Sequence, residues 1–289
     1  MILIADGGST KTEWSVLSAT GTRKIITQGI SPYFLNTDQI SLLLKQELLV
    51  NLAEAKNIQQ VFYYGTGCTS PHTVSIVYNA LTTLFPGAPI HIDYDLVAAA
   101  HALCGKTEGI ACILGTGSNS CYYNGNKIEL NSPGLGYILG DEGSGAHLGK
   151  KIIAAYLYGK LDNQLEAVFQ NRFTVNKDSL LESIYTVALP NRYLASYSIF
   201  FSEHRGHPHL EKLLTEGLDD FFKVHISTYP QSILVPVHFT GSIAWGYRDV
   251  LAELCKKYNF TPGKIIKEPM NGLVGYYRNN YTHLLNQFE

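Results

Sequence analysis

Two glycine-rich segments, each set between an apolar run and a second strand-like run, constrain the fold of this chain most strongly. One is Leu114–Ser120, which follows the short apolar run Ile110–Leu114. The other is Asp6–Thr12, between the apolar residues Met1–Ala5 and the alternating residues Glu13–Leu17. Short apolar runs and period-two alternation predict strands, so each glycine-rich segment is expected at the tip of a hairpin. Backbone N–H groups at such a tip can surround a phosphate.

Neither tip matches the two common nucleotide-binding motifs. The chain contains no G-x-x-x-x-G-K-[ST] spacing, and no G-x-G-x-x-G follows a predicted strand. Because each tip leads into a strand rather than a helix, it is not the phosphate loop of a P-loop protein.

Both halves of the chain begin with the hairpin and continue as strands and helices. After the first tip we expect strands at 22–28, 60–65 and 90–93 and helices at 37–55, 71–85 and 95–103, with Thr37 capping the first helix. After the second tip we expect strands at 127–130, 233–239 and 265–267 and helices at 147–158, 161–169, 178–188, 194–203, 210–229, 243–258 and 271–285. This internal duplication predicts an α/β fold of two similar domains facing each other across a cleft.

The polar segment 105–109 marks the expected domain boundary. We expect an N-terminal domain of residues 1–108 and a C-terminal domain of residues 109–289 that carries a helical insertion. The last helix is expected to pack back onto the N-terminal domain.

Composition excludes several classes of partner. Of 289 residues, 45% are hydrophobic, and 22 basic against 24 acidic side chains give a net charge of -2, so nucleic acid is not an expected partner. No apolar run approaches the length of a membrane span, and no signal peptide precedes the first strand, so no membrane partner is expected. The five cysteines form no C-x-x-C pair, which is typical of reduced thiols in a cytoplasmic protein.

Two more segments complete a recognisable set, Phe239–Ser242 and Gly136–Ser144, the latter reading GYILGDEGS. In order along the chain, Asp6–Thr12, Leu114–Ser120 and Phe239–Ser242 resemble the phosphate-1, phosphate-2 and adenosine motifs of the actin-like ATPase superfamily, which includes sugar kinases and Hsp70. The GDEGS element resembles the N-acetylglucosamine kinase branch of the BadF/BadG/BcrA/BcrD ATPase family. The resemblance covers essentially the whole chain.

The resemblance implies two actin-like (ribonuclease H-like) domains around a cleft. It also implies a kinase that uses ATP and Mg²⁺ to phosphorylate the 6-hydroxyl of an amino sugar, with N-acetylglucosamine as the leading acceptor. Glucosamine and N-acetylmuramic acid are variants of the same class. A homodimer is a further expectation.

Asp6 ends the first strand, where a carboxylate can hold Mg²⁺ through water; otherwise it is a turn aspartate. Lys11 either contacts a phosphate or only extends from the tip. The residues that the resemblance assigns to ATP binding are Gly7, Gly8, Ser9, Thr10, Lys11, Thr12, Thr116, Gly117, Gly241 and Ser242.

Asp95 opens an alanine-rich helix, the position at which the resembling kinases carry their catalytic base. A carboxylate there can accept the hydroxyl proton during phosphoryl transfer, although the same position also suits a helix cap. We treat Asp93 as structural.

Asp141 in the GDEGS turn is expected to accept hydrogen bonds from sugar hydroxyls, whereas Glu142 is not expected to touch the sugar. The family usually has an asparagine before the proline of the loop at 30–34, and here Ser31 precedes Pro32, which puts the exact sugar in doubt. The residues that the resemblance assigns to the sugar are Ser31, Ser118, Asn119, Gly136 and Asp141.

Two other functions fit the same fold. One is an ATPase that activates a 2-hydroxyacyl-CoA dehydratase, which needs exposed cysteines for a [4Fe–4S] cluster shared by a dimer. The other is a sugar or nucleotide sensor without turnover. The histidines at 204, 207 and 209 have no zinc-ligand spacing and indicate a loop instead.

Overall fold

The computed structural model describes residues 1–8, 11–187 and 189–281. The chain divides into two compact units. Unit 1 comprises residues 1–106 and 268–289, and unit 2 comprises residues 107–267. The first crossing lies two residues before the expected position, and the chain returns to unit 1 at Glu268, ahead of the last helix.

Unit 1 contains a five-stranded sheet built around the first hairpin. The hairpin strands run antiparallel, and two further strands lie parallel to the first one. The order across the sheet is β3 (Thr22–Gln28), β2 (Lys11–Leu17), β1 (Ile2–Gly7), β4 (Gln60–Gly65) and β5 (Ile90–Asp93).

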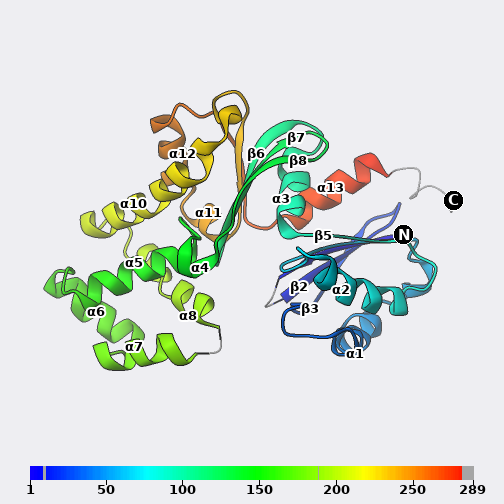
Figure 1. Ribbon diagram of the computed structural model, residues 1–289, viewed down its shortest axis with the longest axis horizontal. Coiled ribbons are helices and arrows are strands. Elements are labelled where there is room, and N and C mark those ends of the chain that lie inside the picture. The colour runs from blue at the N-terminus through cyan, green and yellow to red at the C-terminus, as the bar shows by residue number, and fades with distance from the viewer. Residues whose placement is uncertain (9–10, 188, 282–289) are drawn as a thin grey trace. The chain divides into compact units, whose positions relative to one another are not determined.

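Helices cover both faces of this sheet. One face is covered by α1 (Thr37–Glu47) and α2 (Pro71–Leu84), and the other by α3 (Asp95–Cys104) and α13 (Met270–Asn280) (Figure 1). The α1 face buries an apolar core that includes Leu3, Trp14 and Val61. Alternate residues of β1 and β4 point to opposite faces, and both faces are covered, so these strands are apolar almost throughout.

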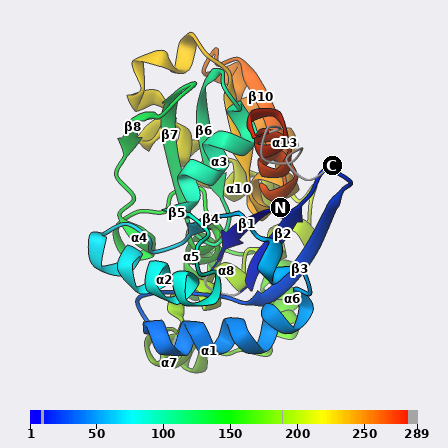
Figure 2. The same cartoon turned by 90° about the vertical axis from the view of Figure 1, so that its right-hand side faces the viewer.

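Unit 2 repeats the same topology. Its sheet runs in the order β8 (Ile128–Ser132), β7 (Ser118–Asn124), β6 (Glu108–Leu114), β9 (Val237–Thr240) and β10 (Pro262–Ile266). Figure 2 shows β6, β7 and β8 side by side. As in unit 1, the first three strands form antiparallel pairs and the last two are parallel to the first. The predicted α/β class and its duplicated sheet are therefore confirmed.

Most helices of unit 2 lie in the connection between β8 and β9. They are α4 (Gly136–Leu139), α5 (Gly145–Leu157), α6 (Asn163–Phe173), α7 (Lys177–Thr186), α8 (Pro190–Ser196), α9 (Ile199–Glu203) and α10 (Pro208–Val224). After β9 come α11 (Ser242–Gly246) and α12 (Arg248–Lys257). Buried aromatic side chains, among them Phe169, Phe200 and Phe221, fill the core between these helices. Nowhere in the residues placed by the structure is a helix both long and apolar enough to cross a membrane.

The first helix differs from its prediction at both ends. Its cap is Asn36 and not Thr37, because the Asn36 side chain accepts the N–H of Gln39 at 2.9 Å while the Gln39 side chain accepts the N–H of Asn36 at 3.0 Å. The helix ends at Glu47 instead of near residue 55, and the Asn51 amide there donates to the Glu47 carbonyl at 2.9 Å. Two short 3-10 turns, at Leu49–Asn51 and Ala55–Asn57, follow.

Later elements also differ. The helices expected at 194–203 and 243–258 are each divided in two, into α8 and α9 and into α11 and α12. The strand expected from residue 233 begins only at Val237, and Pro230–Ile233 forms a 3-10 turn. The last helix ends at Asn280, and residues 282–285 of the predicted 271–285 lie outside the described part of the chain.

Candidate functional site

The predicted site residues fall in both units. Unit 1 holds Asp6, Gly7, Gly8, Lys11, Thr12, Ser31 and Asp95, and unit 2 holds Thr116, Gly117, Ser118, Asn119, Gly136, Asp141, Gly241 and Ser242. Ser9 and Thr10, predicted to bind ATP, lie outside the described residues.

The tip of the first hairpin is closed by its own backbone. Gly7 pairs with Thr12 across the ladder, and the N–H of Gly8 donates to the carbonyl of Lys11 at 3.0 Å. A β-carbon on Gly7 would lie 2.4 Å from the hydroxyl oxygen of Tyr63. The packing of a buried tyrosine is therefore enough to require glycine at position 7.

Asp6 and Asp95 form a pair of partly buried carboxylates in unit 1. Asp6 is the second-last residue of β1, and Asp95 is the first residue of α3. The hydroxyl of Thr66 donates to Oδ2 of Asp95 at 3.3 Å, and the Thr66 N–H donates to the Gly7 carbonyl at 2.8 Å. Thr66 thus ties the first tip to Asp95.

Both carboxyl groups hold their protons more tightly than in water. Burial raises the pKa of Asp95. Burial, followed by the nearby charges of Asp95 and Glu13, raises the pKa of Asp6 to about 7. At Asp6 the carboxylates of Asp95 and Glu13 act in the same direction as burial, and Lys11 opposes them.

The acidic neighbours of Asp6 suit a divalent cation at this carboxylate. Among residues 1–8, 11–187 and 189–281, no three side chains of His, Cys, Asp or Glu gather closely enough to hold a metal alone. Mg²⁺ in phosphoryl-transfer sites is commonly held through one or two carboxylates, several waters and the substrate phosphates. An oxygen ligand with two acidic neighbours fits that kind of site.

Lys11 is paired within unit 1. Its Nζ lies 3.0 Å from Oε1 of Glu268, the first residue of the chain on its return to unit 1. Both side chains are about half exposed, at 56% and 46%. Any contact between Lys11 and a phosphate must therefore compete with this carboxylate.

The loop containing Ser31 packs beside the turn that holds Asp95. Ser31 is buried, and its carbonyl accepts the N–H groups of Phe34 and Leu35 at 3.0 Å. A β-carbon on Gly67, next to Thr66, would lie 2.8 Å from the ring of Tyr33. The structure thus brings the Ser31 loop and Asp95 into one region of unit 1.

The tip of the second hairpin is fixed by the start of α5. The N–H of Gly115 donates to the Gly117 carbonyl at 3.0 Å, which closes the turn. The N–H groups of Gly145 and Ala146 donate to the carbonyls of Gly115 and Thr116 at 2.8 and 3.1 Å. The first amides of α5 therefore hold this tip in place.

Asp141 lies directly against the second tip. Its backbone is in the left-handed region, with φ of 59°, and Oδ1 accepts the N–H of Ser118 at 3.4 Å. A β-carbon on Gly117 would lie 2.9 Å from Oδ2 of Asp141. Burial raises the pKa of this carboxyl group. The hydroxyl oxygen of Ser118 is buried without a hydrogen-bond partner among the described residues, so a ligand could supply one.

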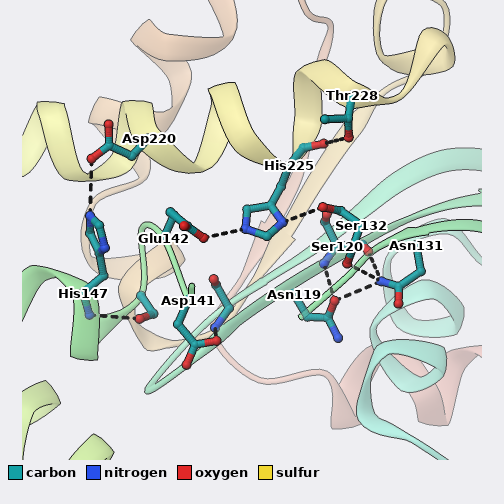
Figure 3. Close-up of polar contacts among 12 residues, drawn as sticks. Asn119, Ser120, Asn131, Ser132, Asp141, Glu142, His147, Asp220, His225 and Thr228 are labelled. Carbon is teal, nitrogen blue, oxygen red and sulfur yellow. Dashed lines mark hydrogen bonds and ion pairs between the residues drawn. The ribbon is translucent and has the colours of Figure 1, made fainter. Parts of the chain in front are cut away.

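Asn119 can only donate to a ligand. Its Oδ1 accepts the N–H of Ser120 at 2.9 Å and Nδ2 of Asn131 at 3.0 Å (Figure 3). A backbone N–H is always a donor, so the atom that faces it must be the amide oxygen. The Nδ2 group is then the part of Asn119 that remains to meet a ligand.

The other predicted positions mark turns. Gly241 has φ of 116°, and a β-carbon there would lie 2.3 Å from the carbonyl oxygen of Leu114, so it must be glycine for β9 to end beside the second tip. Ser242 is exposed as the first residue of α11. Gly136 is the first residue of α4, and its carbonyl accepts the N–H of Gly140 at 2.8 Å.

A buried polar network behind these residues was not predicted from the sequence. The ring of His225 lies between Glu142, with Nε2 to Oε2 at 3.0 Å, and Ser132, with Nδ1 to Oγ at 2.9 Å. The Tyr229 hydroxyl contacts Ser120 and accepts the N–H of Ser132 at 2.7 Å. These partners are 83 to 109 positions apart, so no local pattern marks them.

Comparison with known proteins places the chain. No family model matches it, and neither does a curated protein. The crystal structure of a candidate N-acetylglucosamine kinase from Porphyromonas gingivalis is 40% identical in sequence, with a TM-score of 0.92, over 97% of this chain and all of that one.

More distant structures share the fold. A candidate N-acetylglucosamine kinase from Chromobacterium violaceum is 18% identical, with a TM-score of 0.71, over 95% of this chain and 98% of that one. A ROK family glucokinase from Streptomyces griseus, in complex with glucose and AMPPNP, is 16% identical, with a TM-score of 0.52, over 95% and 97%. The identity to the P. gingivalis protein over nearly the full length decides the family. The chain belongs with that protein among the sugar kinases of the actin/Hsp70/sugar kinase superfamily.

Proposed function

We propose that this enzyme transfers the γ-phosphoryl group of ATP to the 6-hydroxyl of N-acetylglucosamine. The names of the two candidate N-acetylglucosamine kinases that it resembles support this acceptor. The GDEGS segment further supports a place in the N-acetylglucosamine kinase branch of the BadF/BadG/BcrA/BcrD ATPases.

The environment of Asp95 is the observation that carries the proposal. As the sugar hydroxyl attacks phosphorus, its proton must pass to a base. Asp95 is a partly buried carboxylate whose pKa is raised by burial and which is oriented by the hydroxyl of Thr66. A raised pKa makes the carboxylate a better proton acceptor.

The residues that we propose for the phosphates are Gly7, Gly8 and Lys11 of unit 1 and Thr116 and Gly117 of unit 2. Gly241 and Ser242 would border the nucleoside. Mg²⁺ held through Asp6 would offset negative charge on the phosphate oxygens.

At the sugar, the site would combine a hydrogen-bond acceptor with a hydrogen-bond donor. The Asp141 carboxylate accepts from hydroxyls, Nδ2 of Asn119 donates to a sugar oxygen, and the unpartnered hydroxyl of Ser118 can do either. Ser31 and Gly136 are the remaining proposed contacts. These groups suit a sugar that offers both a hydroxyl group, as hydrogen-bond donor, and an oxygen atom that accepts a hydrogen bond.

The test is ADP release with MgATP against N-acetylglucosamine, glucosamine, N-acetylmannosamine, N-acetylmuramic acid and glucose. We expect turnover with N-acetylglucosamine and a loss in kcat of about 100-fold or more in Asp95→Asn, the usual size of a general-base effect. Asp93→Asn is the matched control, because Asp93 is a nearby carboxylate with a pKa also raised by burial, and it should keep kcat within about threefold. Sugar-independent hydrolysis, or turnover indifferent to Asp95, would contradict the proposal.

The cysteines argue against a dehydratase-activating ATPase. All five (Cys68, Cys104, Cys112, Cys121 and Cys255) are buried, and none forms a disulfide. A cluster shared by two copies needs thiolates at a surface. Thiols outside disulfides also support our proposal that the enzyme works in the cytoplasm. A homodimer stays a prediction.

A further inference from the structure

We propose that His225 and Tyr229 are positioning residues for the sugar end of the site. His225 holds Glu142 apart from Asp141, and Tyr229 holds the strand that carries Asn119. This inference rests on the proposed sugar contacts of Asp141 and Asn119.

His225 donates to Glu142. The ring is buried, with 3% of its surface exposed, and its Nε2 lies 3.0 Å from Oε2 of Glu142. An ionised carboxylate can only accept, so Nε2 carries a proton. Nδ1, 2.9 Å from the Ser132 hydroxyl, has a partner that can donate or accept. The ring is therefore held at both nitrogens and fixes Glu142 in one direction.

Glu142 needs such a partner because of its neighbour. Asp141 and Glu142 are consecutive, yet Asp141 accepts the N–H of Ser118 at the start of β7, whereas Figure 3 shows Glu142 directed to His225. The charge of Glu142 already adds to the rise in the pKa of Asp141. Without His225, the Glu142 carboxylate would lose its donor in a largely buried place, and the turn that presents Asp141 would rearrange to solvate it.

Tyr229 holds strand β7, which contains Asn119, and strand β8. Its hydroxyl donates to the carbonyl of Ser120 at 2.9 Å and accepts the N–H of Ser132 at 2.7 Å. Ser120 in turn donates its N–H to Oδ1 of Asn119. The tyrosine thereby fixes the strand pair from which Asn119 presents its donor.

The two positioning residues share Ser132. His225 contacts its hydroxyl and Tyr229 accepts its N–H, and the two lie four positions apart, at either side of the 3-10 turn Ile226–Thr228. One segment thus sets both the acceptor Asp141 and the donor Asn119. Neither side chain forms a described hydrogen bond with the second tip at Gly115–Gly117. Loss of either side chain should therefore weaken sugar binding more than ATP binding.

Two substitutions at residue 225 separate the effect of the N–H group toward Glu142 from the effect of losing the imidazole ring. A glutamine amide can place an N–H near the position of Nε2, toward Glu142, whereas an asparagine amide reaches only the position of Nδ1, toward Ser132. We expect His225→Asn to raise the KM for the sugar about tenfold while the KM for ATP stays within about twofold. His225→Gln should return the sugar KM to within about threefold of wild type.

His147→Gln is the matched control. His147 is another largely buried histidine of unit 2 paired with a carboxylate, Asp220, at 3.3 Å. His147→Gln should leave the KM for the sugar and the KM for ATP within about twofold of the wild-type values. Should His225→Asn fail to fold, Tyr229→Phe serves instead. It removes one hydroxyl, keeps the ring, and should raise the sugar KM about fivefold.

The inference would be overturned if the KM for the sugar and the KM for ATP rose equally. It would also be overturned if His225→Asn and Tyr229→Phe both had the KM values of wild type. If wild type releases ADP without dependence on any amino sugar, the proposed function fails and this inference with it. If wild type is sugar-dependent and these variants are unaffected, only the positioning role is wrong.

Discussion

His238, on β9, is a single residue whose protonation should set part of the acid stability. Its Nδ1 accepts the N–H of Lys264 at 2.8 Å, and its ring is buried beside Gly263. Burial lowers its pKa to about 4. A proton on Nδ1 would place two donors face to face, so the folded state requires the neutral ring.

The sign of the pH effect follows from that pKa. The folded value lies below the unfolded value of about 6.5, so stability contributed by neutral His238 is complete above pH 6.5 and is lost as the pH falls toward 4. Between pH 7 and 4.5 we expect a loss of roughly 2 to 3 kcal/mol in the free energy of unfolding from this residue.

Denaturant unfolding at both pH values checks this. In His238→Gln, which has no titrating ring, the loss between pH 7 and 4.5 should be smaller than in wild type by that amount. His72→Gln, at an exposed position of α2, should keep the wild-type pH dependence. Parallel pH curves for wild type and His238→Gln would contradict the assignment.

Glycines in helices show how packing between elements decides the effect of a substitution. A β-carbon on Gly149, in α5, would lie 1.8 Å from the backbone carbonyl oxygen of Leu194, in α8. Backbone cannot move aside as a side chain can, so Gly149→Ala should destabilise the protein by roughly 3 kcal/mol or more.

Gly275, in α13, is the matched control. A β-carbon there meets no atom of the described residues within 4 Å. Because alanine favours a helix over glycine, Gly275→Ala should be neutral or stabilising by up to about 1 kcal/mol. Thermal melting of both variants tests the pair. A Gly149→Ala protein as stable as wild type would show that α5 and α8 can separate.

Strands with ends marked by glycine, proline or turn residues were predictable from the sequence. The ranges of β3, β4 and β5 match their predictions, with Gly21 and Gly29 beside β3, Gly65 at the end of β4 and Pro89 before β5. The run from Ile233 also looked like a strand. Ile233 and Leu234 are instead 64% and 77% exposed before β9 begins, since an apolar run does not itself distinguish a strand from a turn.

In the candidate site, the sequence predicted groups but not the directions of their atoms. The motifs indicated Asn119, and only the neighbours Ser120 and Asn131 show that its oxygen is already used. The motifs indicated no role for His225, because its partners lie on other elements far away in sequence. Such tertiary contacts are not encoded in any local spacing.

At the scale of the whole molecule, one ion pair links the first tip to the segment at which the chain returns to unit 1. Lys11 is held by Glu268, the residue at which the chain re-enters unit 1. An exposed pair is worth up to about 1 kcal/mol, so releasing Lys11 should strengthen ATP binding by at most about fivefold. Glu268→Gln is therefore expected to lower the KM for ATP by about two- to fivefold, and Lys11→Ala to raise it.

Steady-state kinetics with varied ATP measures both variants. Glu54→Gln is the control, because Glu54 pairs with Arg23 in the same unit at similar exposure but away from the tip. Its KM for ATP should equal that of wild type. An unchanged KM for ATP in Glu268→Gln would indicate that Lys11 does not reach the phosphates.

The shared strand order of the two sheets has a consequence for how such enzymes diversify. In unit 1 the third and fourth strands are joined by residues 29–59, whereas in unit 2 the corresponding connection is residues 133–236. The longer connection contains Asp141, Glu142, His225 and Tyr229. After duplication of an ancestral gene, insertions into this one crossover could alter acceptor selectivity while the strand order stayed under purifying selection. New specificities in this lineage should therefore arise by changes in loop length and sequence there, and the sheets should be its most slowly evolving parts.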